Sequence, residues 1–145
     1  TNQPKMFETY NVGTMAKIVD WNQGNDGLLG LTTMGSQKFK LLTMTKQDDG
    51  LNIGQIERID KEGEFKPTEN FSYLISLLKA ILDDINLYND DEKRFDSASW
   101  VSFRFAEILP LKLEDKQKCL EIDDPIIRLN FLEPLIKMIR ENSQQ

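Results

Sequence analysis

Residues 26–46 have the sequence DGLLGLTTMGSQKFKLLTMTK, and this stretch decides the fold class of the first half of the chain. It is rich in β-branched and aliphatic residues, which favour strands, and it contains glycine where a chain can reverse. Residues of the same kind precede it from Val12 and follow it to Ile59. The pattern predicts a meander of four strands, at 12–21, 28–34, 37–46 and 52–59.

Three turns are expected between these strands, because glycine and its polar neighbours tolerate the positive φ angles of tight reversals. The expected turns are Asp26-Gly27, Gly35-Ser36 and Asp49-Gly50.

The fourth strand is the ambiguous one. Ile53, Ile56 and Ile59 recur every third residue instead of every second, and Gly54 indicates a bulge between them. A helix at 52–59 therefore remains an alternative to the strand.

After residue 64 the apolar residues adopt the three-and-four spacing of amphipathic helices. The first helix is expected at about 69–87 and is followed by a polar loop at 89–94. Asp96 or Ser97 can cap a second helix that Pro110 ends. The remaining expectations are a short helix at 113–121 and a last helix that starts at Asp124-Pro125 and is kinked or divided at Pro134.

The 145 residues contain no histidine and one cysteine, and the formal net charge is −6. Without histidine the chain cannot form a Ser-His-Asp or Cys-His site, or a zinc site that uses imidazole. Cys119 cannot form a disulfide within the chain, and its apolar neighbours predict a small buried side chain. A single cysteine and no evident signal peptide lead us to expect a cytoplasmic protein.

Two kinds of motif resemble a phosphate-binding loop and a calcium loop, but each lacks residues that such a site needs. Gly30 and Gly35 have the spacing of a phosphate-binding loop, but Ser36-Gln37 stands where that loop needs lysine and a hydroxyl residue. Acidic pairs such as Asp83-Asp84 lack the alternating spacing and central glycine of a calcium loop. A Ser-Lys dyad is compatible with the composition, although no pair marks a nucleophile. We therefore expect no enzyme, no cofactor and no metal.

The negative charge and the absence of a basic run count against nucleic acid and anionic membranes as partners, because both kinds of binding depend on clustered lysine and arginine. No apolar run approaches the roughly 20 residues of a membrane-spanning helix.

Residues 12–21 and 26–42, Gly54-Gln-Ile-Glu57, and the helical segments 106–111 and 124–129 resemble one family along most of the chain. That family comprises the amino-terminal domain of ATP-dependent Lon proteases and the stand-alone bacterial proteins that consist of this domain. The family's opening Pro-Leu-Phe-Pro-like segment is not found, so the chain resembles the larger carboxyl-terminal part of such a domain.

The resemblance implies an α+β fold, in which a PUA-like β pseudo-barrel at 1–66 is followed by a carboxyl-terminal α-helical bundle at 67–145. It implies a non-catalytic module that recognises unfolded or exposed apolar polypeptide segments, as an adaptor in protein quality control. If the first strands are absent, open strand edges favour a homodimer. The alternatives are a PUA-like RNA-binding module and, third, a small hydrolase.

Apolar side chains that point away from the expected core are the candidates for partner binding, since flexible thioethers and aromatic rings adapt to varied peptides. The four candidates are Trp21, Met34, Met44 and Phe65.

Overall fold

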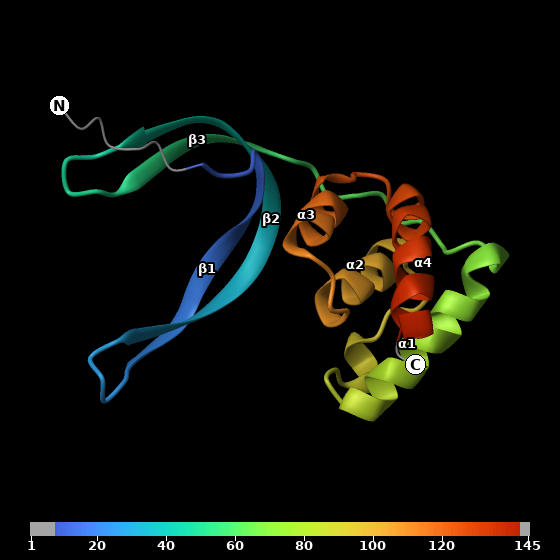
Figure 1. The fold of residues 1–145 in the computed structure, drawn as a ribbon. Helices are drawn as coiled ribbons and strands as arrows, with labels where there is room; N and C mark the ends of the chain where they lie inside the picture. The colour runs from blue at the N-terminus through green and yellow to red at the C-terminus, as the bar shows by residue number, and fades with distance from the viewer. Residues whose placement is uncertain (1–7, 143–145) are drawn as a thin grey trace. The chain divides into compact units, whose positions relative to one another are not determined.

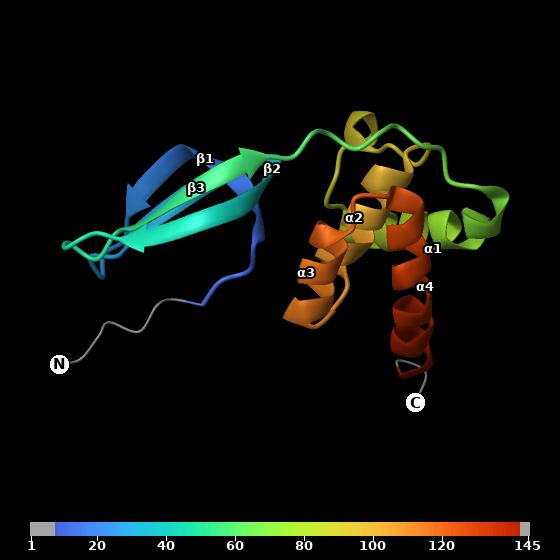
Figure 2. The ribbon, with the colours of Figure 1, turned by 90° about the horizontal axis from the view of Figure 1, so that it is seen from above.

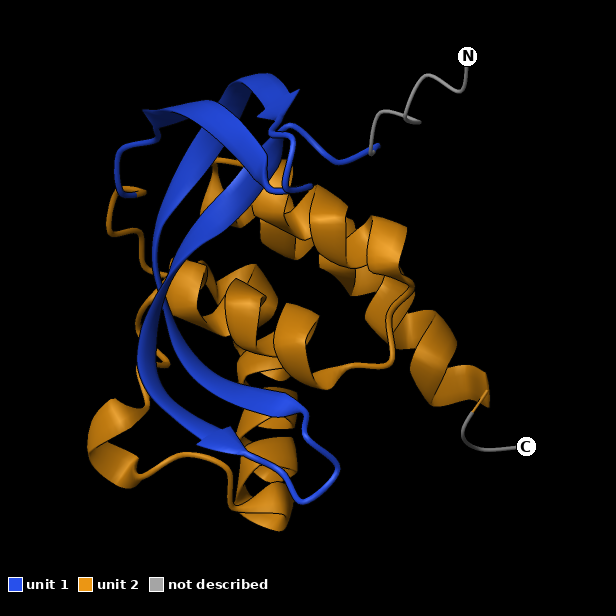
Figure 3. Cartoon of the chain, turned by 90° about the vertical axis from the view of Figure 1, so that its left-hand side faces the viewer, with its two compact units in different colours: residues 1–61 blue, residues 62–145 orange. Residues whose placement is uncertain are grey.

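The computed structural model describes residues 8–142. The chain forms two compact units, residues 1–61 and residues 62–145, which Figure 3 shows in blue and orange. The first unit contains the strands and the second contains the helices, so the fold is α+β. No helix within residues 8–142 is both long enough and apolar enough to cross a membrane.

Over residues 8–61 the sheet unit has three antiparallel strands, β1 (Val12–Gln23), β2 (Leu29–Lys46) and β3 (Asn52–Arg58) (Figures 1 and 2). Their order in the sheet is β1-β2-β3. The long β2 is the shared strand. Its first part pairs with β1 and its last part with β3, and only Phe39 and Lys40 pair with both.

Two of the three expected turns are confirmed and one is wrong. Gly27 and Gly50 have φ angles of 80° and 91°, as tight reversals require, and they join the strands of the two hairpins. Gly35 has no such angle and pairs with Ala16 inside β2, so the expected strands 28–34 and 37–46 are one strand. Ser36 and Gln37 form a bulge there, because one residue of β1, Met15, lies opposite the two of them.

The fourth expected segment is a strand, β3, and the helical alternative is wrong. Gly54 does not form the expected bulge, since it pairs with Met44. The irregularity lies on β2, between Leu41 and Thr43, which pair with the neighbours Ile56 and Gln55. A Cβ on Gly54 would come within 2.6 Å of the Leu41 side chain, so this glycine makes room for its neighbour.

Over residues 62–142 the helical unit contains four α-helices and two short 3₁₀ turns. The expected helix 69–87 is a 3₁₀ turn, η1, followed by α1, and the expected loop 89–94 contains the second 3₁₀ turn, η2. The third helix has the predicted bounds. The elements are η1 (Glu69–Phe71), α1 (Ser72–Ile85), η2 (Asp90–Glu92), α2 (Ala98–Ile108), α3 (Leu113–Glu121) and α4 (Pro125–Asn142).

The predicted helix starts are confirmed by their capping bonds. Of the two residues proposed to cap α2, Ser97 occupies the cap position, and its Oγ accepts from the Trp100 amide at 3.3 Å. The Asp124 carboxylate accepts from the amides of Ile126 and Ile127 at 2.8 and 3.1 Å. These bonds satisfy amides that have no partner within the first helical turn.

The expected division of the last helix at Pro134 is wrong, because α4 continues through this residue. Pro134 is exposed, so the carbonyl that loses its helical partner can bind water. Leu132 and Ile136 on either side are fully buried and hold the helix against the core.

The core of the molecule lies in the helical unit, where α4 packs against both α2 and α3. Within residues 8–61 no residue is buried. The core that the structure describes is formed by Phe71, Leu74, Leu78, Leu82, Ala98, Val101, Phe105, Ala106, Leu109, Cys119, Leu129, Leu132 and Ile136, and Pro125 is also buried.

Candidate functional site

One side of the β1–β2 hairpin is apolar and exposed. Trp21 pairs with Leu31, and Leu29 and Thr33 lie two residues to either side of Leu31 on the same strand. Ile18 pairs with Thr33. Directly paired residues point to the same side of a sheet, as do alternate residues of one strand. We call Ile18, Trp21, Leu29 and Leu31, which are 57%, 65%, 60% and 51% exposed, the hairpin face.

A bulge in β1 creates this face. Ile18 pairs with Thr33 and Asp20 with Thr32, so Val19 is an extra residue opposite the junction of two neighbours. Ile18 and Trp21 are three residues apart, and in a regular strand they would point to opposite sides. The extra residue brings both to the side of Leu31.

The other side of the hairpin is more polar. Lys17 pairs with Met34 and Asp20 pairs with Thr32, and by the strand alternation these residues point away from the hairpin face. Met34 is 61% exposed. The hairpin therefore offers two sides of different chemistry.

The edges of the hairpin carry backbone groups that no strand of the described residues pairs. β1 is an edge strand of the sheet, and β3 pairs with β2 only from Phe39 onward, so the β1–β2 hairpin extends beyond β3 (Figure 1). Residues 29–37 of β2 therefore have one strand neighbour, β1. Unpaired edges can accept a further strand.

The four predicted contact residues do not form one surface within a unit. Trp21 is part of the hairpin face, whereas Met34 lies on the opposite side of the same hairpin. Met44 is half-buried and pairs with Gly54 of β3. Phe65 is 49% exposed and belongs to the helical unit.

Sequence reasoning missed three members of the hairpin face, Ile18, Leu29 and Leu31. The alternation of Leu29, Leu31 and Thr33 was a usable signal for a common side of β2. The bulge at Val19 had no such signal, because it depends on the partner strand.

Three ionisable side chains of the helical unit, Tyr88, Arg104 and Glu107, form a cluster. The Tyr88 hydroxyl donates to Glu107 and accepts from Arg104, whose guanidinium lies 5.0 Å from the Tyr88 ring centre. Burial, and next the bond to Glu107, raises the pKa of Tyr88. This cluster ties α2 to the segment before it, since Tyr88 precedes α2 whereas Arg104 and Glu107 belong to it.

Two observations bear on the metal and cysteine chemistry of the described residues. Residues 8–142 contain no group of three histidine, cysteine, aspartate or glutamate side chains placed to hold a metal ion. Cys119 is fully buried as predicted, and burial raises the pKa of its thiol, which disfavours the reactive thiolate.

Almost the whole chain matches one known protein family, and relatives from that family match it over a similar length. The family described as the ATP-dependent protease La (LON) substrate-binding domain matches residues 1–138. The Lon protease of Vibrio parahaemolyticus is 29% identical over 139 residues, and Lon protease 1 of Bacillus subtilis is 27% identical over 140. These matches cover 91% and 89% of this chain but 17% of each relative, so the chain spans about a sixth of their length.

Two solved structures share the fold. A Lon N-terminal domain protein from Xanthomonas campestris superimposes with a TM-score of 0.73 and 29% identity, over 86% of this chain and 68% of that one. The N-terminal domain of the Mycobacterium avium complex Lon protease has a TM-score of 0.63 and 16% identity, over 89% and 72% of the two chains. The second likeness concerns the fold alone. From the family match over residues 1–138, this chain belongs to the family of Lon substrate-binding domains.

Proposed function

We propose that this chain is a non-catalytic polypeptide-recognition module, and that the hairpin face binds extended apolar segments of unfolded or partly unfolded proteins. The proposal rests on the exposed apolar side chains of the hairpin face in a chain that belongs to a family of substrate-binding domains. The relatives that the chain resembles are named Lon proteases, and a protease acts on proteins, which favours a polypeptide as the partner.

Strand addition is the binding mode that the hairpin supports. An extended segment can pair its backbone with the edge of β1 or with residues 29–37 of β2, while every second side chain packs on the hairpin face. Backbone pairing tolerates many sequences, and the apolar face selects segments with alternating apolar residues. Such a mode suits a module that binds varied clients.

The role we propose is that of an adaptor in protein quality control, with the chemistry of proteolysis supplied elsewhere. The sequence contains no histidine and no complete phosphate-binding motif, which supports a binding role over a catalytic one. We also propose that the sheet unit is part of a PUA-like pseudo-barrel, that the helices form a bundle, and that open strand edges allow a homodimer.

The test is a binding assay of the purified chain against reduced casein at physiological salt, with single-stranded RNA in parallel. Trp21→Ala removes the largest side chain of the hairpin face and is expected to weaken casein binding about tenfold or more, as loss of a central aromatic anchor does. Leu31→Ser is expected to act in the same direction. Affinity measured by fluorescence anisotropy of labelled casein gives the comparison.

Met34→Ser is the matched control, because Met34 is as exposed as Trp21 but lies on the other side of the hairpin. It should leave binding within about twofold of the unchanged chain, as expected for a residue outside the contact. An equal loss for Met34→Ser would mean that both sides contribute. Salt-sensitive binding of RNA with no binding of casein would contradict the proposal and favour the RNA-binding alternative.

A further inference from the structure

The connection between the two units is held at its sheet end. The Ile59 amide donates to the Lys38 carbonyl at 3.0 Å, and the Gln37 side chain donates to the Ile59 carbonyl at 3.0 Å. Both bonds lie beyond the end of β3 at Arg58. The chain is therefore part of the sheet unit through Ile59.

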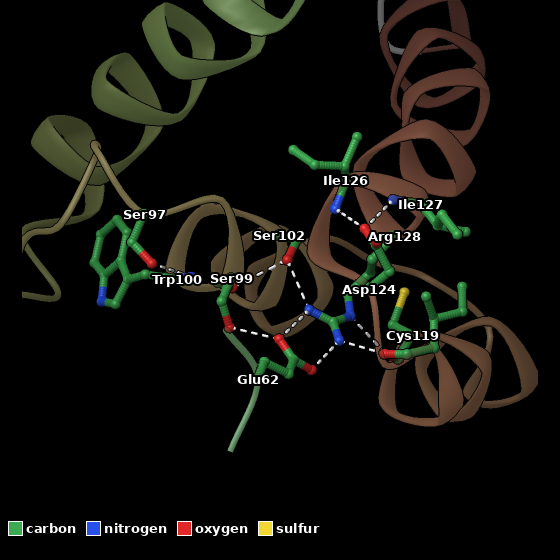
Figure 4. A network of polar contacts seen from close by, with 11 residues as sticks. Glu62, Ser97, Ser99, Trp100, Ser102, Cys119, Asp124, Ile126, Ile127 and Arg128 are labelled. Carbon is green, nitrogen blue, oxygen red and sulfur yellow. Dashed lines mark hydrogen bonds and ion pairs between the residues drawn. The ribbon is translucent and has the colours of Figure 1, made fainter. Parts of the chain in front are cut away.

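It is held again at Glu62, the first residue of the helical unit. Glu62 Oε2 accepts from Arg128 Nη1 at 3.0 Å and from Ser99 Oγ at 2.7 Å, and Glu62 Oε1 accepts from Arg128 Nη2 (Figure 4). The carboxylate and guanidinium thus meet through two parallel bonds. The Arg128 side chain is fully buried and that of Glu62 is 8% exposed.

Arg128 has no donor left for another partner. A guanidinium has five N–H donors, and the remaining three go to the Ser102 hydroxyl and to the carbonyls of Cys119 and Ile122. Its plane lies over the Phe103 ring, 3.8 Å from the ring centre. Since α2, α3 and α4 together hold Arg128 in place, Glu62 binds a site that the helices have already built.

A second bond fixes the connection three residues later. The Ala98 amide, at the start of α2, donates to the Phe65 carbonyl at 2.8 Å. Within the described residues Asp60 and Lys61 are exposed and make no hydrogen bond or ion pair. Two residues therefore separate the anchor at Ile59 from the anchor at Glu62.

We propose that the Glu62–Arg128 pair is a latch that fixes residues 62–65 to the helical unit and confines the backbone freedom between the two units to Asp60 and Lys61. A closed latch leaves a connection of two free residues. When the latch is open, the next fixed point is the Phe65 carbonyl, so the free connection extends from Asp60 to Glu64. A longer free connection widens the range over which the sheet unit can move. The latch is independent of what the hairpin face binds.

The unchanged protein provides the first test, through ¹⁵N relaxation of the backbone amides. Residues 62–65 are expected to have order parameters of about 0.85, like the helices, and Asp60 and Lys61 values below about 0.6. Order parameters of residues 62–65 as low as those of Asp60 and Lys61 would overturn the proposal, since no latch would then hold them.

The second test opens the latch without leaving a buried charge alone. The double substitution Glu62→Leu and Arg128→Met replaces the pair by apolar side chains, a change that buried ion pairs often tolerate. The order parameters of residues 62–64 are expected to fall to those of Asp60 and Lys61. The amide chemical shifts of α1 should stay unchanged, as a control that the helical unit remains folded. Unchanged order parameters at 62–64 would show that the ion pair is not the latch.

Two single variants complete the design. Ser99→Ala removes one hydrogen bond to Glu62 and keeps the ion pair, so the order parameter of residue 62 should fall by less than in the double variant. If the double variant does not fold, this single variant tests whether the contacts of Glu62 hold the segment. Lys137→Ala breaks the exposed pair between Lys137 and Glu133 on the same helix as Arg128. It should leave residues 60–65 unchanged, and a fall there would mean that general loosening of α4 is responsible.

Discussion

The two units differ in how they are stabilised. Within residues 8–142, the helical unit buries a core of apolar side chains, several of them with no exposed surface, whereas no residue of the sheet unit is buried. The sheet instead exposes large apolar side chains such as Trp21, Leu29 and Leu31. A sheet of three strands without a covered face is marginally stable on its own. The comparison teaches that the helices supply the stable framework and that the strands supply apolar surface.

The largest effect is expected for substitutions in the core of the helical unit. Leu132→Ala leaves a cavity in the core and should lower the free energy of unfolding of the helical unit by ~2–5 kcal/mol. Leu31→Ala removes an exposed side chain and should change the stability of the sheet unit by less than ~0.5 kcal/mol. Urea denaturation in a Trp21→Phe background isolates Trp100 as the reporter of the helical unit, and a Trp100→Phe background isolates Trp21. A cost for Leu31→Ala as large as that for Leu132→Ala would mean that the hairpin face is covered in solution.

A smaller effect is expected at the start of α2. Ser97→Ala removes the oxygen that accepts from the Trp100 amide and should lower the free energy of unfolding by ~1 kcal/mol. Thr68 precedes the 3₁₀ turn η1 and makes no capping bond through its side chain, so Thr68→Ala is the control. Equal costs for the two substitutions, measured by urea denaturation, would show that the bond at Ser97 does not matter.

The smallest effect concerns pH. Burial raises the pKa of Tyr73 to about 12, and the hydrogen bond that its hydroxyl donates to Glu133 adds to this. An unfolded tyrosine ionises near pH 10. Because the folded state keeps the proton longer, the contribution of Tyr73 to stability is constant below about pH 10 and is lost as the pH rises towards 12.

Near-ultraviolet absorbance during an alkaline titration measures this ionisation. Tyr73→Phe should remove an ionisation step near pH 12. A step near pH 10 that disappears in this variant would contradict the raised pKa. Tyr73 is only partly buried, so the effect on stability is expected to be small.

Signals close together in the sequence predicted the helices well. Asp124 ahead of Pro125 marked the start of α4, and Ser97 marked the start of α2, because capping is a contact between residues two or three positions apart. Leu74, Leu78 and Leu82 are buried and lie four residues apart, so the apolar spacing within one helix accounts for the buried side of α1.

The sheet was predicted less well, because its details depend on pairing between distant residues. Gly35-Ser36 has the composition of a turn, yet β1 pairs along both sides of it and holds it as a bulge. The hairpin face was recognised only in part for the same reason. Trp21 was predicted to be a contact residue, a role that awaits the binding assay, whereas Ile18 joins its side through an extra residue at Val19.

By itself the sequence determined the class of the fold, the helix starts, the reversals at Gly27 and Gly50, and the absence of histidine chemistry, since each depends on residue type and local spacing. Only the tertiary structure decided which apolar side chains of the strands share a face, and that Arg128, a residue type that is seldom buried, is enclosed by three helices and paired with Glu62. These outcomes join residues as far as 66 positions apart. A pattern within one segment cannot specify them, because the partners lie in other segments.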